Sequence, residues 1–330
     1  MQFFKCFFMD TGLIKYGLRD LLLMDKIKDV NILFKRKLPF LIPRIASQYL
    51  SKNKAPMGLQ IEPTNYCHLN CICCSTNRSK RKKGYMDLNL FNKIIVEAAR
   101  NRIKRVHLYL HGEPLLHPKL LLMISLIKEA NLSLTLATNG MLFTRQFSHA
   151  LLETGVDWGD HFMFSILGHT KSTHEKVMAG VNHEIVVQNV MDFYEVRNAK
   201  KMNGPIIEVI FHTMLENKDE TIDYQKFWNK RVDHVRIVNS ISHSFANYKQ
   251  ENQCSFKREK TCRLLWERMP VFWDGSVTIC DQDLEGKYIY GTLVNHSIEQ
   301  LWHNTILTEI KQLHRKKRFQ NIEICSECDW

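Results

Sequence analysis

The sequence predicts an α/β fold: a partial (β/α)6 TIM-like barrel with a helical N-terminal extension and a small C-terminal domain. Six short apolar segments, most followed by an amphipathic segment, lie between residues 57 and 238. Alternation of strands and helices is typical of parallel strands joined by right-handed crossovers. Six such units are too few for a closed eight-stranded barrel, so we expect an open one.

Hydrophobic periodicity gives the individual elements. Asp87 and Thr144 stand where two of the helices need N-caps. RVHLYL alternates apolar residues with His107 and Tyr109, which is typical of a strand. We expect strands at 57–63, 105–110, 132–137, 161–166, 206–211 and 233–238, and helices at 88–100, 118–130, 144–154, 172–200 (in two pieces) and 219–230.

The alternation of strands and helices is confined to residues 57–245, which predicts three parts. Residues 1–56 hold eleven Lys and Arg against four Asp and show helical spacing of leucines, so we expect a basic helical extension. Residues 57–245 form the barrel. Residues 246–330 form the small domain, with a hairpin turning at Asp274–Gly275 and a capping box of Ser297 and Gln300.

Composition is ordinary for a globular protein, with 45% hydrophobic and 24% charged residues, but the formal net charge is +12. We expect a cytoplasmic protein, because no stretch reads as a signal peptide or a membrane span. The basic runs NRSKRKK (77–83) and HRKKR (314–318) predict solvated faces. The alternative is contact with an anionic substrate or, through the N-terminal extension, peripherally with a membrane. We expect no nucleic-acid partner.

The ten cysteines are clustered, with four at 67–74 and five at 254–328. In a large chain without an export signal, clustering indicates metal ligands rather than disulfides. Cys67-x3-Cys71-x2-Cys74 can bind three corners of an iron–sulfur cubane and leave one iron open. The alternative is zinc, which would need a fourth N or S ligand, and no histidine stands at an obvious spacing to supply it.

This motif, placed after the first strand of an alternating chain, resembles that of the radical SAM superfamily. The resemblance implies that Cys67, Cys71 and Cys74 bind a [4Fe–4S] cluster, and that S-adenosylmethionine on its open iron is reductively cleaved to a 5′-deoxyadenosyl radical. Cys73 stands where the family usually has an apolar residue, so it is expected beside the adenine rather than on iron. A thiol at this position also allows Cys73 to exchange with one of the three cysteines as an iron ligand.

Four further segments resemble family motifs around the cofactor: LHGEPLLHP (110–118), ATNG (137–140), SILG (165–168) and HEKVMAG (174–180). LHGEPLLHP (110–118) is similar to the GGEP motif, with His111 replacing the first glycine, and a glycine in this turn permits close approach. Leu167 stands where the family often has an Asp, and Met178 where it often has an Arg. In the family that Arg often contacts the carboxylate of the cofactor, so the residue that binds the carboxylate here is left open. The residues expected at the cofactor are Gly112, Glu113, Pro114, Asn139 and Ser165.

The C-terminal part resembles the SPASM/twitch extension of radical SAM enzymes. Cys262-x12-Gly275-x4-Cys280, followed by Cys325-x2-Cys328, carries the resemblance. It implies an auxiliary cluster held by Cys262, Cys280, Cys325 and Cys328. We expect a single auxiliary [4Fe–4S] cluster, since the given sequence ends two residues later, with Cys254 a spare and Cys6 incidental.

These cofactors imply a radical enzyme. Our hypothesis is that it oxidises a small-molecule alcohol, similar to a sugar or cyclitol, by two electrons. The basic surface favours an anionic substrate. A flavodoxin- or ferredoxin-type protein would donate the electron. The sequence assigns no catalytic acid or base; His107, His111 and His117 flank the cofactor turn, and Asp281 and Asp283 follow a cluster cysteine. The alternatives are a SPASM-type peptide maturase or an epimerase. A non-catalytic redox sensor or zinc-binding interaction protein would have no need of the GEP turn.

Overall fold

The computed structural model describes residues 55–239, 261–326 and 328 of the 330-residue chain. Leu50–Trp330 forms one compact unit. The helical extension predicted for residues 1–56 and the spare Cys254 lie outside the described residues, except for Ala55 and Pro56. Within the described part, no helix is both long and apolar enough to cross a membrane.

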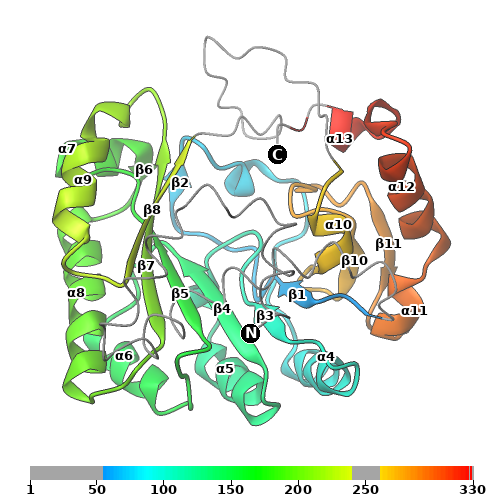
Figure 1. Ribbon diagram of the computed structural model, residues 1–330, viewed down its shortest axis with the longest axis horizontal. Coiled ribbons are helices and arrows are strands. Elements are labelled where there is room, and N and C mark those ends of the chain that lie inside the picture. Colours follow the sequence, from blue (N-terminus) through cyan, green and yellow to red (C-terminus); the bar gives the residue numbers. More distant parts are fainter. Residues whose placement is uncertain (1–54, 240–260, 327, 329–330) are drawn as a thin grey trace, which may run out of the picture. The chain divides into compact units, whose positions relative to one another are not determined.

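Six parallel strands, as the sequence predicts, lie next to one another in a nine-stranded sheet and reach one of its edges (Figure 1). The strands run side by side in the order in which the chain makes them. The second of the six strands, RVH, is shorter than predicted, because the chain turns after Leu108, whose N–H still donates to the Thr135 carbonyl at 2.7 Å. The six are β1 (Gly58–Ile61), β3 (Arg105–His107), β4 (Ser133–Thr138), β5 (His161–Ser165), β7 (Ile206–Thr213) and β8 (His234–Asn239).

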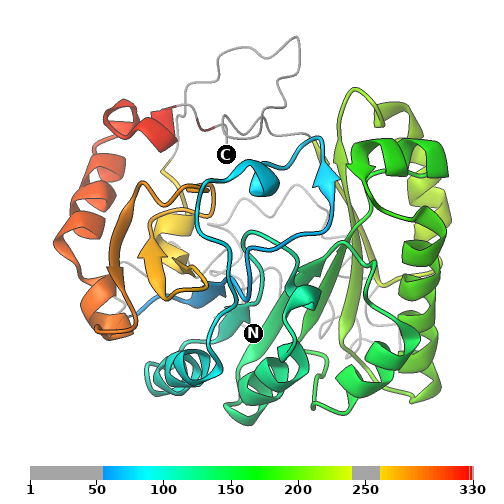
Figure 2. The same ribbon diagram turned by 180° about the vertical axis from the view of Figure 1, so that it is seen from behind.

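Helices cover the outer side of this curved sheet, and the long segment between β1 and the first helix lies on its inner side (Figures 1 and 2). Asp87 caps the first helix by accepting from the N–H groups of Asn89 and Leu90, and Thr144 caps the third, both as predicted. The helices are α4 (Leu88–Arg100), α5 (Leu120–Glu129), α6 (Arg145–Leu152), α7 (Lys171–Val177), α8 (His183–Ala199) and α9 (Thr221–Trp228).

The core between sheet and helices is aromatic around α6 and α8. Phe143 contacts Phe162 and Phe164 of β5 and Phe193 of α8 in edge-on or tilted pairs with centroids 4.8–6.1 Å apart. Because side chains alternate along a strand, burying Phe162 and Phe164 on this side turns His161, Met163 and Ser165 to the inner side of the sheet.

The C-terminal part extends the same sheet. β9 (Arg268–Val271) pairs in parallel with β1, and β10 (Ser276–Thr278) follows antiparallel to β9, so the predicted hairpin at Asp274–Gly275 is confirmed. The capping box of Ser297 and Gln300 is also present. The boundary near residue 246 stays a prediction, since one sheet runs through both parts. The other elements here are α10 (Leu264–Glu267), β11 (Ile289–Thr292), α11 (Ile298–Trp302), α12 (Thr305–Arg315), η6 (Phe319–Asn321) and α13 (Glu323–Ser326).

Candidate active site

The first cysteine motif lies in the segment between β1 and α4, on the inner side of the sheet (Figure 2). Burial raises the pKa of Cys71, and the charges of Cys73, Cys74 and Cys67 raise it further, so the four sulfurs are electrostatic neighbours. Burial also raises the pKa of Cys67 to about 11 and that of Cys73 to about 12. Iron binding must therefore displace protons from these thiols.

A two-residue strand, β2 (Asn70–Cys71), fixes the middle of the motif. It pairs with β6 (Met178–Ala179), which places Met178 opposite Cys71. The Ile72 N–H donates to the Val177 carbonyl at 2.9 Å. Met178, at the position where the family often has an Arg, is thus buried and supports the cysteine loop.

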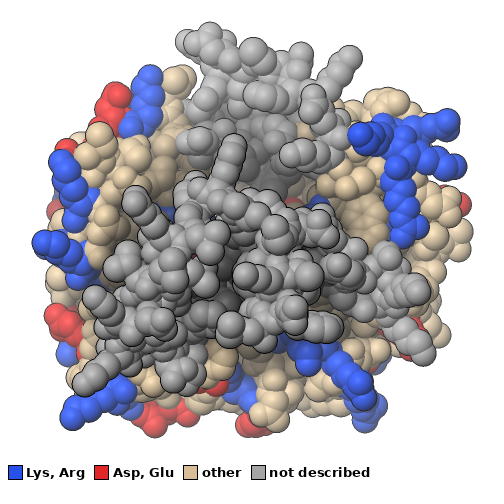
Figure 3. Space-filling model, in the orientation of Figure 1, with Lys and Arg blue, Asp and Glu red and all other residues tan. Residues whose placement is uncertain are grey.

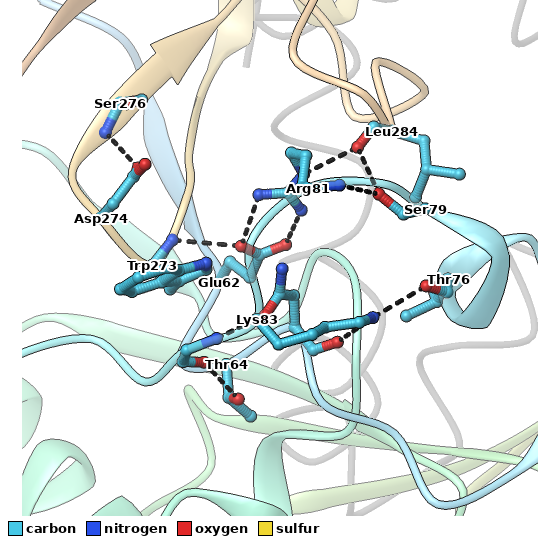
Figure 4. Close-up of polar contacts among 12 residues, drawn as sticks. Glu62, Thr64, Thr76, Ser79, Arg81, Lys83, Trp273, Asp274, Ser276 and Leu284 are labelled. Atoms are coloured by element: carbon cyan, nitrogen blue, oxygen red, sulfur yellow. Dashed lines mark hydrogen bonds and ion pairs between the residues drawn. The ribbon is translucent and has the colours of Figure 1, made fainter.

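Lys83 holds the two ends of the cysteine loop together. Its Nζ donates to the carbonyls of Asn65 at 2.8 Å and Thr76 at 2.9 Å (Figure 4). The Asn65 side chain adds two bonds, from its Nδ2 to the Lys82 carbonyl and from the Gly84 N–H to its Oδ1, both at 2.9 Å. The residues on both sides of the cysteines are therefore fixed before any cluster binds.

The GEP turn packs directly on this loop. Gly112 has φ +80°, and a Cβ there would lie 2.4 Å from the Thr64 carbonyl oxygen and 2.7 Å from that of Tyr66. The Glu113 N–H donates to the same Tyr66 carbonyl at 2.7 Å. The turn requires glycine because of the chain's own backbone, a reason different from the approach of a cofactor that the sequence suggested.

Glu113 joins the ends of β3 and β4. Its Oε1 accepts from the Thr138 hydroxyl at 2.7 Å and its Oε2 from the Asn139 N–H at 2.9 Å. Burial raises the pKa of Glu113, and these hydrogen bonds counter the rise. Pro114 begins the short helix η4 (Pro114–Leu116), for which Glu113 is the cap. The carboxylate thus fixes the geometry of the site around it.

Two buried polar atoms beside this turn have no hydrogen-bond partner among the described residues. They are Asn139 Nδ2 and His111 Nε2. The Asn139 Oδ1 is occupied, since it accepts from the Met141 N–H at 3.0 Å. An unpaired buried polar group is costly, so each atom indicates a ligand that completes the site.

Ser165 ends β5 and is half-buried on the inner side. Leu167, at the position of the family's Asp, is buried, and its carbonyl accepts from Asn217 Nδ2 at 3.0 Å. The assignment of Gly112, Glu113, Pro114, Asn139, Ser165 and Cys73 to the cofactor stays a prediction.

The candidate acid–base residues differ in how far they are engaged. His117 is held at both ring nitrogens, by the Met86 carbonyl at 3.0 Å and the Lys119 N–H at 3.2 Å, so its role is structural. Asp283 is likewise engaged, accepting from the Thr278 hydroxyl and from two backbone N–H groups. His107 is buried, with no hydrogen-bond partner for its Nδ1 among the described residues.

The four auxiliary cysteines come together from three separate segments. Cys262 precedes α10, Cys280 follows β10, Cys325 lies in α13 and Cys328 follows it. Burial raises the pKa of Cys280, followed by the charge of Asp281, and Cys262 and Cys325 raise it further, so these sulfurs are neighbours. The Cys328 N–H donates to the Cys325 carbonyl at 3.3 Å, which closes the C-x2-C turn.

The two cysteine regions are joined by an ion pair that the sequence did not suggest. Arg81 binds the Glu62 carboxylate and donates through Nε to the Leu284 carbonyl at 2.7 Å, while the Trp273 N–H donates to Glu62 at 3.1 Å (Figure 4). The solvated face predicted for 77–83 is therefore wrong for Arg81 and Lys83. Lys80 and Lys82 are exposed, so burial alternates along a run that is uniformly basic in the sequence.

The second basic run behaves differently. Arg315, Lys316, Lys317 and Arg318 are exposed, and Figure 3 shows Lys and Arg side chains gathered on that side of the C-terminal part. The histidine that begins the run, His314, is buried. The sequence indicates this burial only by placing His314 on the apolar face of the helix that precedes Cys325-x2-Cys328.

The residues present fit iron–sulfur clusters and S-adenosylmethionine. Both sets offer grouped thiols, no disulfide links the described cysteines, and unpaired donors border the GEP turn. Among the described residues, no three Cys, His, Asp or Glu side chains are set to hold a single metal ion.

Comparison with protein families decides the identity. The radical SAM superfamily profile matches residues 61–224, and the profile of the SPASM iron–sulfur cluster-binding domain matches residues 262–329. The chain belongs to the radical SAM superfamily. It is therefore an enzyme that uses S-adenosylmethionine and a [4Fe–4S] cluster, and its SPASM domain adds auxiliary iron–sulfur binding.

Relatives extend over most of this radical SAM chain. It is 23% identical over 320 residues to a tungsten-containing aldehyde ferredoxin oxidoreductase cofactor-modifying protein of Pyrococcus furiosus, covering 82% of this chain and 88% of the relative. It is 22% identical over 275 residues to the S-adenosyl-L-methionine-dependent 2-deoxy-scyllo-inosamine dehydrogenase of Niallia circulans, covering 82% and 92%.

A solved structure supports the fold. The crystal structure of Streptococcus suis SuiB bound to the precursor peptide SuiA matches with a TM-score of 0.65 and 15% identity, covering 81% of this chain and 70% of that one. The radical SAM barrel with a C-terminal cluster domain, as predicted from the sequence, is confirmed. Enzymes with this architecture act on small molecules or on peptides with the help of an electron donor.

Proposed function

We propose that this radical SAM enzyme oxidises a small-molecule alcohol by two electrons, with the auxiliary cluster accepting one of them. The observation that carries the proposal is the auxiliary site, which offers four cysteines for one cubane. With a protein ligand on every iron, such a cluster has no open position for substrate and is suited to electron transfer. The similarity to a dehydrogenase of an aminocyclitol over 92% of that relative's length supports the same reaction class.

Cys67, Cys71 and Cys74 would hold the first cluster, and Cys262, Cys280, Cys325 and Cys328 the auxiliary one. When bound, the first cluster and S-adenosylmethionine supply a radical that takes a hydrogen atom from the substrate carbon, and the auxiliary cluster supplies an acceptor for the remaining electron. A base removes the hydroxyl proton, which balances the oxidation of the alcohol to a carbonyl. The base is not among His117 and Asp283, because their polar atoms are engaged.

The rest of the chain prepares the site. Lys83 and the Asn65 side chain fix the cysteine loop, and Glu113 fixes the ends of β3 and β4. The unpaired Nδ2 of Asn139 would donate to the cofactor. Burial of these groups excludes water, which protects a radical reaction.

The proposal includes a cytoplasmic location and a flavodoxin- or ferredoxin-type electron donor. The basic surface around Arg315–Arg318 favours an acidic donor or an anionic substrate.

Peptide modification is the second candidate, because the solved relative SuiB is bound to a precursor peptide and resembles this chain with a TM-score of 0.65. An epimerase would differ from both by returning a hydrogen to the substrate carbon, with no net oxidation.

The test uses anaerobically reconstituted enzyme with dithionite, S-adenosylmethionine and a panel of cyclitols, sugars and sugar phosphates deuterated at the carbinol carbon. We expect one deuterium in 5′-deoxyadenosine for each carbonyl product formed. Cys280→Ser should still form 5′-deoxyadenosine but lose the carbonyl product. Turnover only with a peptide, or product with hydrogen from solvent at the same carbon, would contradict the proposal.

A further inference from the structure

We propose that His314 is a positioning residue of the auxiliary cluster, which donates a hydrogen bond from Nε2 to the Cys325 sulfur and thereby raises the reduction potential of the cluster. The proposal rests on the auxiliary cluster of the proposed function. It concerns a residue outside the cysteine set, and it follows from two contacts of one buried ring.

His314 is placed by α12. Leu307, Ile310 and His314 share the buried face of this helix, and His314 is fully buried although Arg315–Arg318 directly after it are exposed. Its ring lies between Trp266 and Phe319, with centroids 6.1 and 5.0 Å away. These aromatic contacts fix the ring and keep it from turning outward with the basic residues.

The ring bridges two cysteines of the auxiliary set. The backbone N–H of Cys262 donates to Nδ1 at 3.3 Å, and Nε2 lies 3.3 Å from Cys325 Sγ. Cys262 and Cys325 are 63 positions apart in the sequence, so one imidazole connects the first and third ligands.

The first contact determines the role of the second. A backbone N–H can only donate, so Nδ1 must carry a lone pair. The proton of the neutral imidazole is then on Nε2, which faces the sulfur. Once Cys325 binds iron as a thiolate, the sulfur is the acceptor of this bond.

A hydrogen bond to a ligand sulfur draws electron density from the cluster and stabilises its reduced form, which carries the greater negative charge. His314 would therefore favour electron acceptance by the auxiliary cluster. The proposed oxidation requires the auxiliary cluster to accept this electron. The bond also orients Cys325 on a short helix of four residues, α13 (Glu323–Ser326).

The experiment compares His314→Phe, His314→Gln and Ile310→Val in the full-length chain, each reconstituted anaerobically. Phenylalanine keeps a ring between Trp266 and Phe319 but has no N–H. Glutamine keeps an N–H donor of similar reach, and Ile310→Val removes one methylene from the same buried helix face. Iron is counted, and both cluster potentials are measured by redox titration followed by electron paramagnetic resonance.

We expect His314→Phe to shift the auxiliary potential to a more negative value, with iron content and the potential of the S-adenosylmethionine-responsive cluster unchanged. His314→Gln should shift it less, and Ile310→Val not at all. In the unmutated enzyme, pulsed measurements on the reduced auxiliary cluster should detect a weak nitrogen coupling that His314→Phe removes.

An unchanged auxiliary potential in His314→Phe at full iron content would overturn this inference alone. Loss of the auxiliary iron in that variant, or a nitrogen coupling as strong as that of a bound imidazole, would make His314 a ligand and overturn its positioning role. An unmutated enzyme with only about four iron atoms, those of one cubane, would overturn the proposed function together with this inference.

Discussion

Arg81 Nη2 lies 2.6 Å from Glu62 Oε1, and the Glu62 side chain is fully buried. Burial raises the pKa of Glu62, and the hydrogen bond and charge of Arg81 oppose the rise. Glu62 directly follows β1, Arg81 follows the first cysteine motif, and both contact the C-terminal part through Trp273 and Leu284 (Figure 4). This pair therefore connects the loop of the first cluster to the auxiliary part.

Removing one partner of this pair should be costly. Arg81→Leu leaves the Glu62 carboxylate buried without its counter-ion, and we expect a loss of about 3–5 kcal/mol in the free energy of unfolding. Arg145→Leu is the matched control, because Arg145 pairs with Asp192 and Glu195 at the surface. It should cost far less, because solvent screens a surface ion pair. Urea unfolding of both variants measures the difference. Equal losses in the free energy of unfolding would show that the buried pair stabilises the fold no more than the surface pair does.

Glycine at 112 should be required by its surroundings as well as by its φ angle. Gly112 and Gly155 have φ +80° and +85°, but a Cβ on Gly155 would meet only Lys128 Cβ, at 3.8 Å. Gly155→Ala should cost about 1–2 kcal/mol, from the left-handed conformation alone. Gly112→Ala should cost more and abolish cleavage of S-adenosylmethionine, because the turn must move off the Thr64 carbonyl. Similar unfolding free energies for the two variants would contradict this packing.

The four clustered thiols of 67–74 should not be equivalent. Cys71→Ser should lose the first cluster, about four iron atoms, because a hydroxyl is a poor replacement for a thiolate ligand. Cys73→Ser should keep the iron content of the unmutated protein. Iron analysis of the two reconstituted variants checks this, and loss of iron in both would make Cys73 a ligand.

Asn139 should contribute to cofactor binding rather than to stability. Its Nδ2 has no partner among the described residues, so Asn139→Ala removes a donor that is unpaired without cofactor. We expect the Kd of S-adenosylmethionine to rise about 2–10-fold, the value of one hydrogen bond. The unfolding free energy of the cofactor-free protein should change by less than about 1 kcal/mol, since only the Met141 bond is lost. Calorimetric titration measures the Kd. The control is Asn101→Ala, because Asn101 ends α4 and its Nδ2 donates to the Glu97 carbonyl of that helix at 3.0 Å. An unchanged Kd in Asn139→Ala would contradict the role.

Much of the fold followed from local patterns in the sequence. The six parallel strands, the caps Asp87 and Thr144, and the hairpin at Asp274–Gly275 depend on periodicity and turn chemistry, which are local. The pairing of β9 with β1 was not predictable in this way, because it joins segments about 210 residues apart through backbone hydrogen bonds that no side-chain pattern records.

The same limit applies to the site. The cysteine spacings could be read directly, but Arg81 looked like one member of a basic run, and only the buried Glu62 explains its position. His314 looked like one more histidine until the fold brought Cys262 and Cys325 to its two ring nitrogens. Charged and polar side chains take their role from long-range contacts, which a single sequence does not give.

The central claim is that the two cysteine sets hold two independent clusters. The most direct measurement is iron analysis with Mössbauer spectroscopy of the reconstituted chain and of a Cys67→Ala/Cys71→Ala/Cys74→Ala variant. We expect about eight iron atoms per unmutated chain and about four in the variant, in one [4Fe–4S] cluster that does not cleave S-adenosylmethionine. A variant without iron, or an unmutated chain with only about four, would contradict the claim.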